Sequence, residues 1–164
     1  MKIIRSVACA ACVMAGIVGC RSASKERSVL MAMEDSVSKL LPTLIESAVS
    51  DPGLTGNGPF VMRQGLIRNE TTSISNEYLE KLSSRFAAGL LSSGGSRFVP
   101  SDSSVQGGKT LAPTAVWDGK LVQKDSRAKD GRFQHEFTLT ISIVDITTGE
   151  HLWRDEGCVR IEHK

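Results

Sequence analysis

The stretch RFQHEFTLTISIVDI, residues 132–146, alternates between two kinds of side chain along most of its length. One parity is mainly apolar and the other mainly polar: Phe133, Phe137, Leu139, Ile141 and Ile143 against Gln134, Glu136, Thr138, Thr140 and Ser142. Such alternation predicts a long β-strand with one face buried and the other facing solvent. His135 shares the parity of the apolar residues, so we expect a partly covered histidine on the strand.

Two further strands flank this stretch, at about residues 115–124 and 151–161, and the connections DSRAKDG and TTGE read as turns. The upstream chain adds two helical patterns and two shorter strand patterns. One helix precedes Asp51, and Pro42 either kinks it or starts a second helix. The other begins at Ser75 as N-cap and ends at Gly94 and Gly95. The prediction is an α/β (α+β) fold of order α-β-α-β-β-β-β, a two-layer sandwich whose mostly antiparallel meander sheet is flanked by helices.

The chain begins with a basic start, a twelve-residue uncharged apolar run from Val7 to Val18, and the sequence IVGC ending at Cys20. The run is too short to span a membrane and is typical of a signal peptide. Its end resembles a bacterial lipobox, in which cleavage precedes a cysteine that becomes lipidated. We therefore expect a signal peptide at 1–19, the lipidated Cys20 with a short tether at 20–33, and a single globular domain at 34–164. The alternative is an ordinary secretory signal in which Cys20 is incidental.

Cleavage would leave a chain with one free thiol and no net charge. Cys9 and Cys12 would be removed and Cys20 lipidated, so Cys158 would remain, and we expect it to be buried, as free cysteines often are. The chain has 20 Lys and Arg and 18 Asp and Glu; the segment 1–19 contains two of the basic residues and no acid, so 18 of each charge remain. This balance gives no indication of nucleic-acid binding.

The sequence contains no recognisable catalytic or metal-binding motif. His135, His151 and His163 have no metal-ligand neighbour at a useful spacing, and no nucleophile elbow or P-loop is present. Cys158 could act as a nucleophile only with a histidine brought to it by the fold. We therefore expect a protein that is not an enzyme and uses no metal or cofactor.

The predicted hairpin tip is the candidate binding site, because it contains several basic residues beside Asp125 and Asp130. Arg127 and Arg132 are the residues that we expect to contact an acidic partner or an anionic glycan. The alternative for the same residues is a solvated turn.

Several stretches together resemble the LpoB family of outer-membrane lipoproteins. They are IRNET (67–71), the run LLSSGGSRFV (90–99) and VDITTGEHLWRDE (144–156), all downstream of the lipobox. The resemblance covers about residues 36–160. The last stretch is also similar to domains of the TolB amino-terminal and curli-secretion type. The family has a long stalk and a helix before the strand that begins near residue 115, whereas here the tether is short and SDSSVQGGKTLAPTA is Gly-rich.

The resemblance implies a small sheet flanked by helices and a non-catalytic function in peptidoglycan synthesis and cell shape. Family members are acylated proteins of the outer membrane that face the periplasm. They bind a small noncatalytic domain of a class A penicillin-binding protein and activate it. The alternative is a structural component of an outer-membrane assembly or secretion system built on a related domain.

Overall fold

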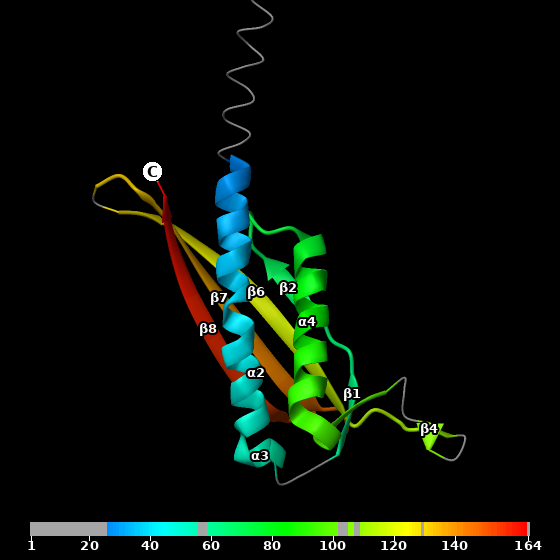
Figure 1. Ribbon diagram of the computed structural model, residues 1–164. Helices are drawn as coiled ribbons and strands as arrows, with labels where there is room; N and C mark the ends of the chain where they lie inside the picture. The colour runs from blue at the N-terminus through cyan, green and yellow to red at the C-terminus, as the bar shows by residue number, and fades with distance from the viewer. Residues whose placement is uncertain (1–25, 56–58, 102–104, 107–108, 129, 164) are drawn as a thin grey trace, which may run out of the picture.

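The computed structural model describes residues 26–55, 59–101, 105–106, 109–128 and 130–163 (Figure 1). Cys20 and the signal peptide therefore lie outside the described residues. Residues 26–38 are helical and residue 39 is a turn. The elements that follow are α2 (Leu40–Ser50), α3 (Pro52–Thr55), β1 (Phe60–Arg63), β2 (Ile67–Glu70), α4 (Asn76–Gly94), a 3-10 turn (Gly95–Arg97), β3 (Phe98–Pro100), β4 (Val105–Gln106), β5 (Lys109–Thr110), β6 (Ala115–Arg127), β7 (Phe133–Asp145) and β8 (His151–His163).

The predicted antiparallel meander is confirmed for the three long strands. β6 pairs with β7 from Ala115 opposite Asp145 to Arg127 opposite Phe133, and β7 pairs with β8 along almost its whole length. The sheet order is β3-β1-β6-β7-β8, with β2 also paired to β6. Between β3 and β6 the chain forms β4 and β5 rather than a helix, among the residues described there.

The short strands pair in parallel, so the sheet is mixed, while the three long strands keep it mostly antiparallel, as predicted. β1 pairs in parallel with β3 and with β6, and β2 pairs in parallel with β6. The reason is the connection: α4 lies between β2 and β3 and returns the chain to the end of the sheet where β1 began, and two strands joined through a helix run in the same direction.

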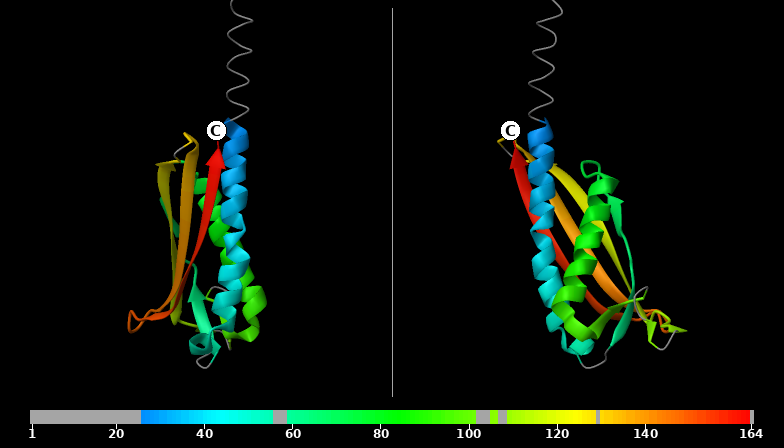
Figure 2. Two further views of the ribbon diagram at one scale, coloured as in Figure 1. Left: turned by 90° about the vertical axis from the view of Figure 1, so that its left-hand side faces the viewer. Right: turned by 45° about the vertical axis from the view of Figure 1, so that its right-hand side comes forward.

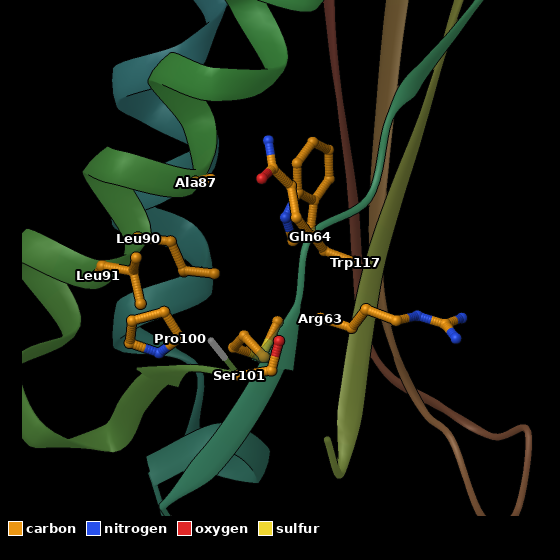
Figure 3. A pocket seen from close by; sticks show the side chains of 9 residues that line it. Arg63, Gln64, Ala87, Leu90, Leu91, Pro100, Ser101 and Trp117 are labelled. Atoms are coloured by element: carbon orange, nitrogen blue, oxygen red, sulfur yellow. The ribbon is translucent and has the colours of Figure 1, made fainter. Parts of the chain in front are cut away.

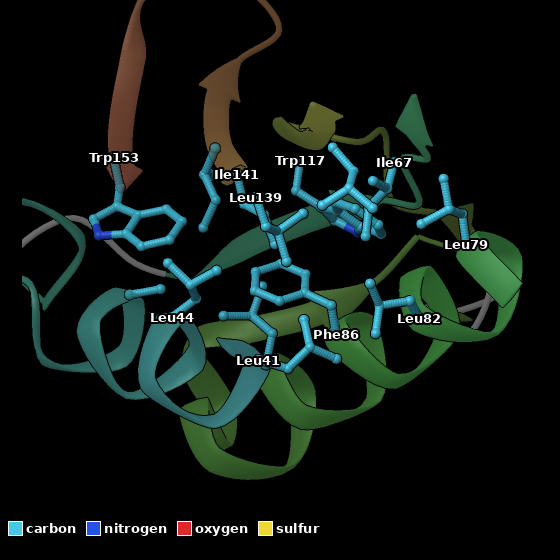
Figure 4. Packing of buried hydrophobic residues seen from close by; sticks show 14 of the residues in the cluster. Leu41, Leu44, Ile67, Leu79, Leu82, Phe86, Trp117, Leu139, Ile141 and Trp153 are labelled. Carbon is cyan, nitrogen blue, oxygen red and sulfur yellow. The ribbon is translucent and has the colours of Figure 1, made fainter. Parts of the chain in front are cut away.

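All the helices cover the same face of the sheet, so the molecule has two layers (Figures 1 and 2). Phe137, Leu139, Ile141 and Ile143 are completely buried beneath them. Side chains of α2 and α4 meet this row in one core, in which the Phe86 ring lies 5.1 Å from that of Trp117 (Figure 4). The odd-numbered residues of β7 therefore face the helices, as the alternation predicts.

The N-terminal helical segment starts earlier than the sequence pattern predicts. Residues 26–33 belong to the predicted tether but are helical, and Met33 is buried in the core. The helix is interrupted at Lys39 and α2 begins at Leu40, so Pro42 lies in the first turn of a second helix, where its missing N–H costs no hydrogen bond. No helix in the described part of the chain is long and apolar enough to cross a membrane.

Local sequence signals determine the ends of α4. The Ser75 hydroxyl accepts a hydrogen bond from the Tyr78 backbone N–H at 3.1 Å, which confirms the predicted N-cap. At the other end Gly95 has a φ of 58°, a conformation that glycine adopts without strain. Arg97 then donates from its guanidinium to the Val49 carbonyl oxygen at 2.9 Å and so joins the ends of α4 and α2.

Candidate binding surfaces

The hairpin between β6 and β7 contains the two arginines that the sequence predicts as partner contacts. Their guanidinium groups have different neighbours. Arg132 lies 2.6 Å from an Asp130 carboxylate oxygen and 2.8 Å from one of Glu162, so its charge is balanced locally. Arg127 instead places its guanidinium carbon 4.5 Å from the centre of the Phe133 ring. Both Arg127 and Phe133 are exposed. The hairpin therefore presents one cation on an aromatic ring and one that is already paired.

Below the tip, His135 belongs to a polar cluster on the helix-facing side of the sheet. Its Nδ1 lies 2.7 Å from Asp125 Oδ1, and the Gln123 amide nitrogen donates to the same oxygen at 2.7 Å. These hydrogen bonds, that of Gln123 first, hold the pKa of Asp125 below its usual value. His135 is partly covered, as predicted. Among the described residues no group of three or more His, Cys, Asp and Glu side chains could hold a metal ion.

Cys158 is exposed, so the prediction of a buried thiol is wrong. In β8 the odd-numbered residues face the helices, and Cys158 lies opposite Thr138 on the other face. Because no helix in the described part of the chain covers that face, the rule that free cysteines are buried fails here. The same geometry separates Cys158 from His135, which lies on the helix-facing side, so this thiol and this imidazole cannot form a nucleophile–base pair.

A groove between α4 and the sheet is a candidate binding surface that the sequence does not predict. It has a volume of about 360 Å³. Ala87, Leu90 and Leu91 of α4 form one wall. Met62, Gln64, Pro100, Ser101 and Trp117 complete the lining, while Arg63 extends away from the helix (Figure 3).

The sheet wall of this groove depends on a bulge between β1 and β2. Arg63 pairs with Val116, and Ile67 pairs with Gly119. Between these two pairs the β1–β2 segment therefore has one more residue than β6. A Cβ at Gly65 would lie 1.5 Å from the Trp117 carbonyl oxygen, and only glycine permits this close approach. The sequence contains one indication of the bulge: apolar and polar side chains do not alternate cleanly over residues 60–68. That pattern does not by itself predict a groove.

The stretches that carry the family resemblance lie in regular elements and in the turns beside them. In IRNET, Asn69 Oδ1 accepts from the Thr71 N–H at 3.0 Å. Directly after IRNET, Gln123 Oε1 accepts from the N–H groups of Thr72 and Ser73. In VDITTGEHLWRDE, Asp145 Oδ1 accepts from two N–H groups of the turn, and Gly149 has a φ of 73°. These motifs therefore have a structural role, whether or not they also contact a partner.

No family model matches this chain, and no curated protein matches it. Several solved structures of low identity are similar to it, among them the following three. The LpoB C-terminal domain from Salmonella enterica has a TM-score of 0.42 and 12% identity, over 76% of this chain and 96% of that one. The PelC dodecamer from Paraburkholderia phytofirmans has a TM-score of 0.40 and 19% identity, over 63% and 72%. Lipoprotein GNA1162 from Neisseria meningitidis has a TM-score of 0.39 and 19% identity, over 65% and 84%.

Proposed function

We propose that this chain is a lipid-anchored protein of the bacterial outer membrane, facing the periplasm, that binds and activates a class A penicillin-binding protein. It would dock on the small noncatalytic domain of that synthase and would carry out no chemistry of its own. The observation that carries the proposal is the coincidence, in one chain, of the lipobox ending at Cys20 with the three stretches that resemble the LpoB family.

The arrangement of the reactive side chains favours binding over catalysis. Cys158 and His135 lie on opposite faces of the sheet. Arg132, Arg160 and Lys120 are each within 2.8 Å of a carboxylate on a neighbouring strand, as parts of a solvated sheet face. A two-layer domain with one open sheet face and a groove beside α4 offers surface to a protein partner.

Activation by such a domain requires differential affinity. The domain must bind the active conformation of the synthase more tightly than the inactive one, because equal affinity shifts no equilibrium. A coupling free energy of about 1–3 kcal/mol would give about 5–150-fold stimulation at saturation. We therefore expect the synthase rate to rise with domain concentration and then reach a plateau.

The test adds residues 21–164, without the lipid, to the class A synthase of the same cell and follows lipid II polymerisation. Saturable stimulation supports the proposal. Arg127→Glu and Arg154→Glu are compared, because Arg154 is an exposed arginine on β8, far from the hairpin. Loss of stimulation with Arg127→Glu alone would place the contact at the hairpin. If no synthase of that cell binds or responds, the activator proposal is refuted and the assembly-component alternative becomes the better hypothesis.

The anchor is tested separately through Cys20→Ala. We expect this variant to accumulate as unprocessed precursor and to lose the mass of the lipid. Normal cleavage, with the variant still in the membrane fraction after lysis without detergent, would refute lipidation at Cys20.

A further inference from the structure

We infer that the β6–β7 hairpin rests on the phospholipid headgroups of the membrane that holds the anchor, with Arg127 and Phe133 as the contact. This inference rests on the lipidation of Cys20 proposed above. It reassigns Arg127 from a protein partner to the lipid surface.

The first argument is the length of chain between the anchor and the fold. Residue 26 is already helical, so six Cα–Cα steps separate it from Cys20. Whatever conformation residues 21–25 adopt, these steps span at most about 22 Å. The end of the domain where the helix at 26–38 begins must therefore stay close to the membrane surface.

The second argument is that the hairpin lies at this same end. Two contacts show that the helices run antiparallel to β8: Gly53 approaches the Leu152 carbonyl oxygen, and Leu40 packs against Gly157. The residues before Leu40 therefore lie toward the C-terminal end of β8. In the sheet, His163 at the end of β8 pairs with Phe133, and Phe133 pairs with Arg127. The hairpin therefore lies beside the end of β8. Figures 1 and 2 show the start of the helix, the hairpin and the C-terminal end of β8 together in all three views.

The third argument is the chemistry of the exposed residues. The carboxylates of Asp130 and Glu162 are paired with Arg132, whereas Arg127 has no ion-pair partner among the described residues. Its guanidinium lies on the ring of Phe133, which is 43% exposed, and Met31 of the nearby helix is 61% exposed. An arginine with an aromatic ring and an apolar side chain suits the boundary between phosphate groups and acyl chains.

This orientation leaves the opposite end of the domain for a partner. Trp117, in the groove beside α4, is ten residues before Arg127 on β6, which corresponds to about 33 Å along the strand. A synthase that bound at the groove would therefore not compete with the membrane for the hairpin.

The experiment uses the mature lipidated protein in vesicles of phosphatidylethanolamine and phosphatidylglycerol that contain a headgroup spin label. A fluorophore is attached to Ser126→Cys or to Glu150→Cys, each in a Cys158→Ser background. Ser126 lies near the tip and Glu150 in the β7–β8 turn, about 36 Å apart along β7. We expect several-fold stronger quenching at position 126 than at 150. We also expect Arg127→Glu, but not Arg154→Glu, to reduce quenching at 126.

Equal quenching at the two positions, stronger quenching at 150, or no effect of Arg127→Glu would overturn the inference. So would loss of stimulation of the synthase by the lipid-free domain carrying Arg127→Glu, because the hairpin would then serve the synthase. A protein that does not float with the vesicles refutes the anchor at Cys20 and this orientation with it. The lipid-free stimulation assay does not depend on the anchor, so failure here and failure of the activator proposal remain distinguishable.

Discussion

Replacing Leu139 by alanine tests the one-sided burial on which the fold depends. Leu139 is completely buried in the middle of β7, between Leu121 of β6 and Gly157 of β8. The substitution removes three carbon atoms, which corresponds to about 2.4 kcal/mol of lost burial. A cavity that stays open adds about 24 cal/mol per Å³, and strands paired on both sides restrict its collapse. We expect the free energy of unfolding to fall by about 2–5 kcal/mol.

The matched control is Thr138→Ala, one residue earlier on the same strand. Thr138 lies on the open face opposite Cys158, so its replacement should change the unfolding free energy by about 0.5 kcal/mol or less. Urea titration followed by tryptophan fluorescence measures both variants, because Trp117 and Trp153 are buried and should report unfolding. Equal and small effects of the two substitutions, at an unchanged urea dependence, would refute the assignment of the two faces of β7.

Three further predictions concern the bulge, the polar cluster and the free thiol. Gly65→Ala should lower the unfolding free energy by about 2 kcal/mol or more, because the new methyl group collides with the Trp117 carbonyl oxygen; a urea titration showing wild-type stability would contradict this. The pKa of Asp125 is lowered in the folded state, so its ionised form stabilises the fold above about pH 4, and this contribution is lost as the pH falls through the folded pKa. Asp125→Asn should therefore destabilise the protein at pH 7, with the difference from wild type shrinking toward pH 3; a difference independent of pH in the same titrations would exclude this explanation. Cys158 should react with a thiol reagent without denaturant, and protection of the native thiol would show that its face of the sheet is covered.

Much of the fold follows from local sequence patterns. The alternation in β7 assigns its two faces because side chains in a strand point to opposite sides regardless of what packs there. Ser75 determines the start of α4, and Gly95 and Gly149 determine turns, because each acts through backbone groups within a few residues. These features require no knowledge of distant contacts.

The features that local patterns predicted wrongly or left open depend on the surroundings of a residue. Whether Cys158 is buried depends on which face of the sheet the helices cover, and its own strand pattern does not contain that information. The parallel pairing of β1 with β3 depends on the path of the chain through α4. Neither follows from residue type or spacing.

The candidate surfaces divide in the same way. The sequence by itself predicted that Arg127 and Arg132 lie at the hairpin between two long strands, because charged residues and glycine interrupt two alternating patterns there. Only the tertiary structure decided that Arg132 is paired with Glu162 of β8 while Arg127 lies on Phe133, and that the helix start lies at the same end of the domain. The groove beside α4 likewise needs the Gly65 bulge, α4 and the end of β3 together. A surface made of segments distant in the chain exists only once long-range pairing has brought them together, and no local pattern encodes it.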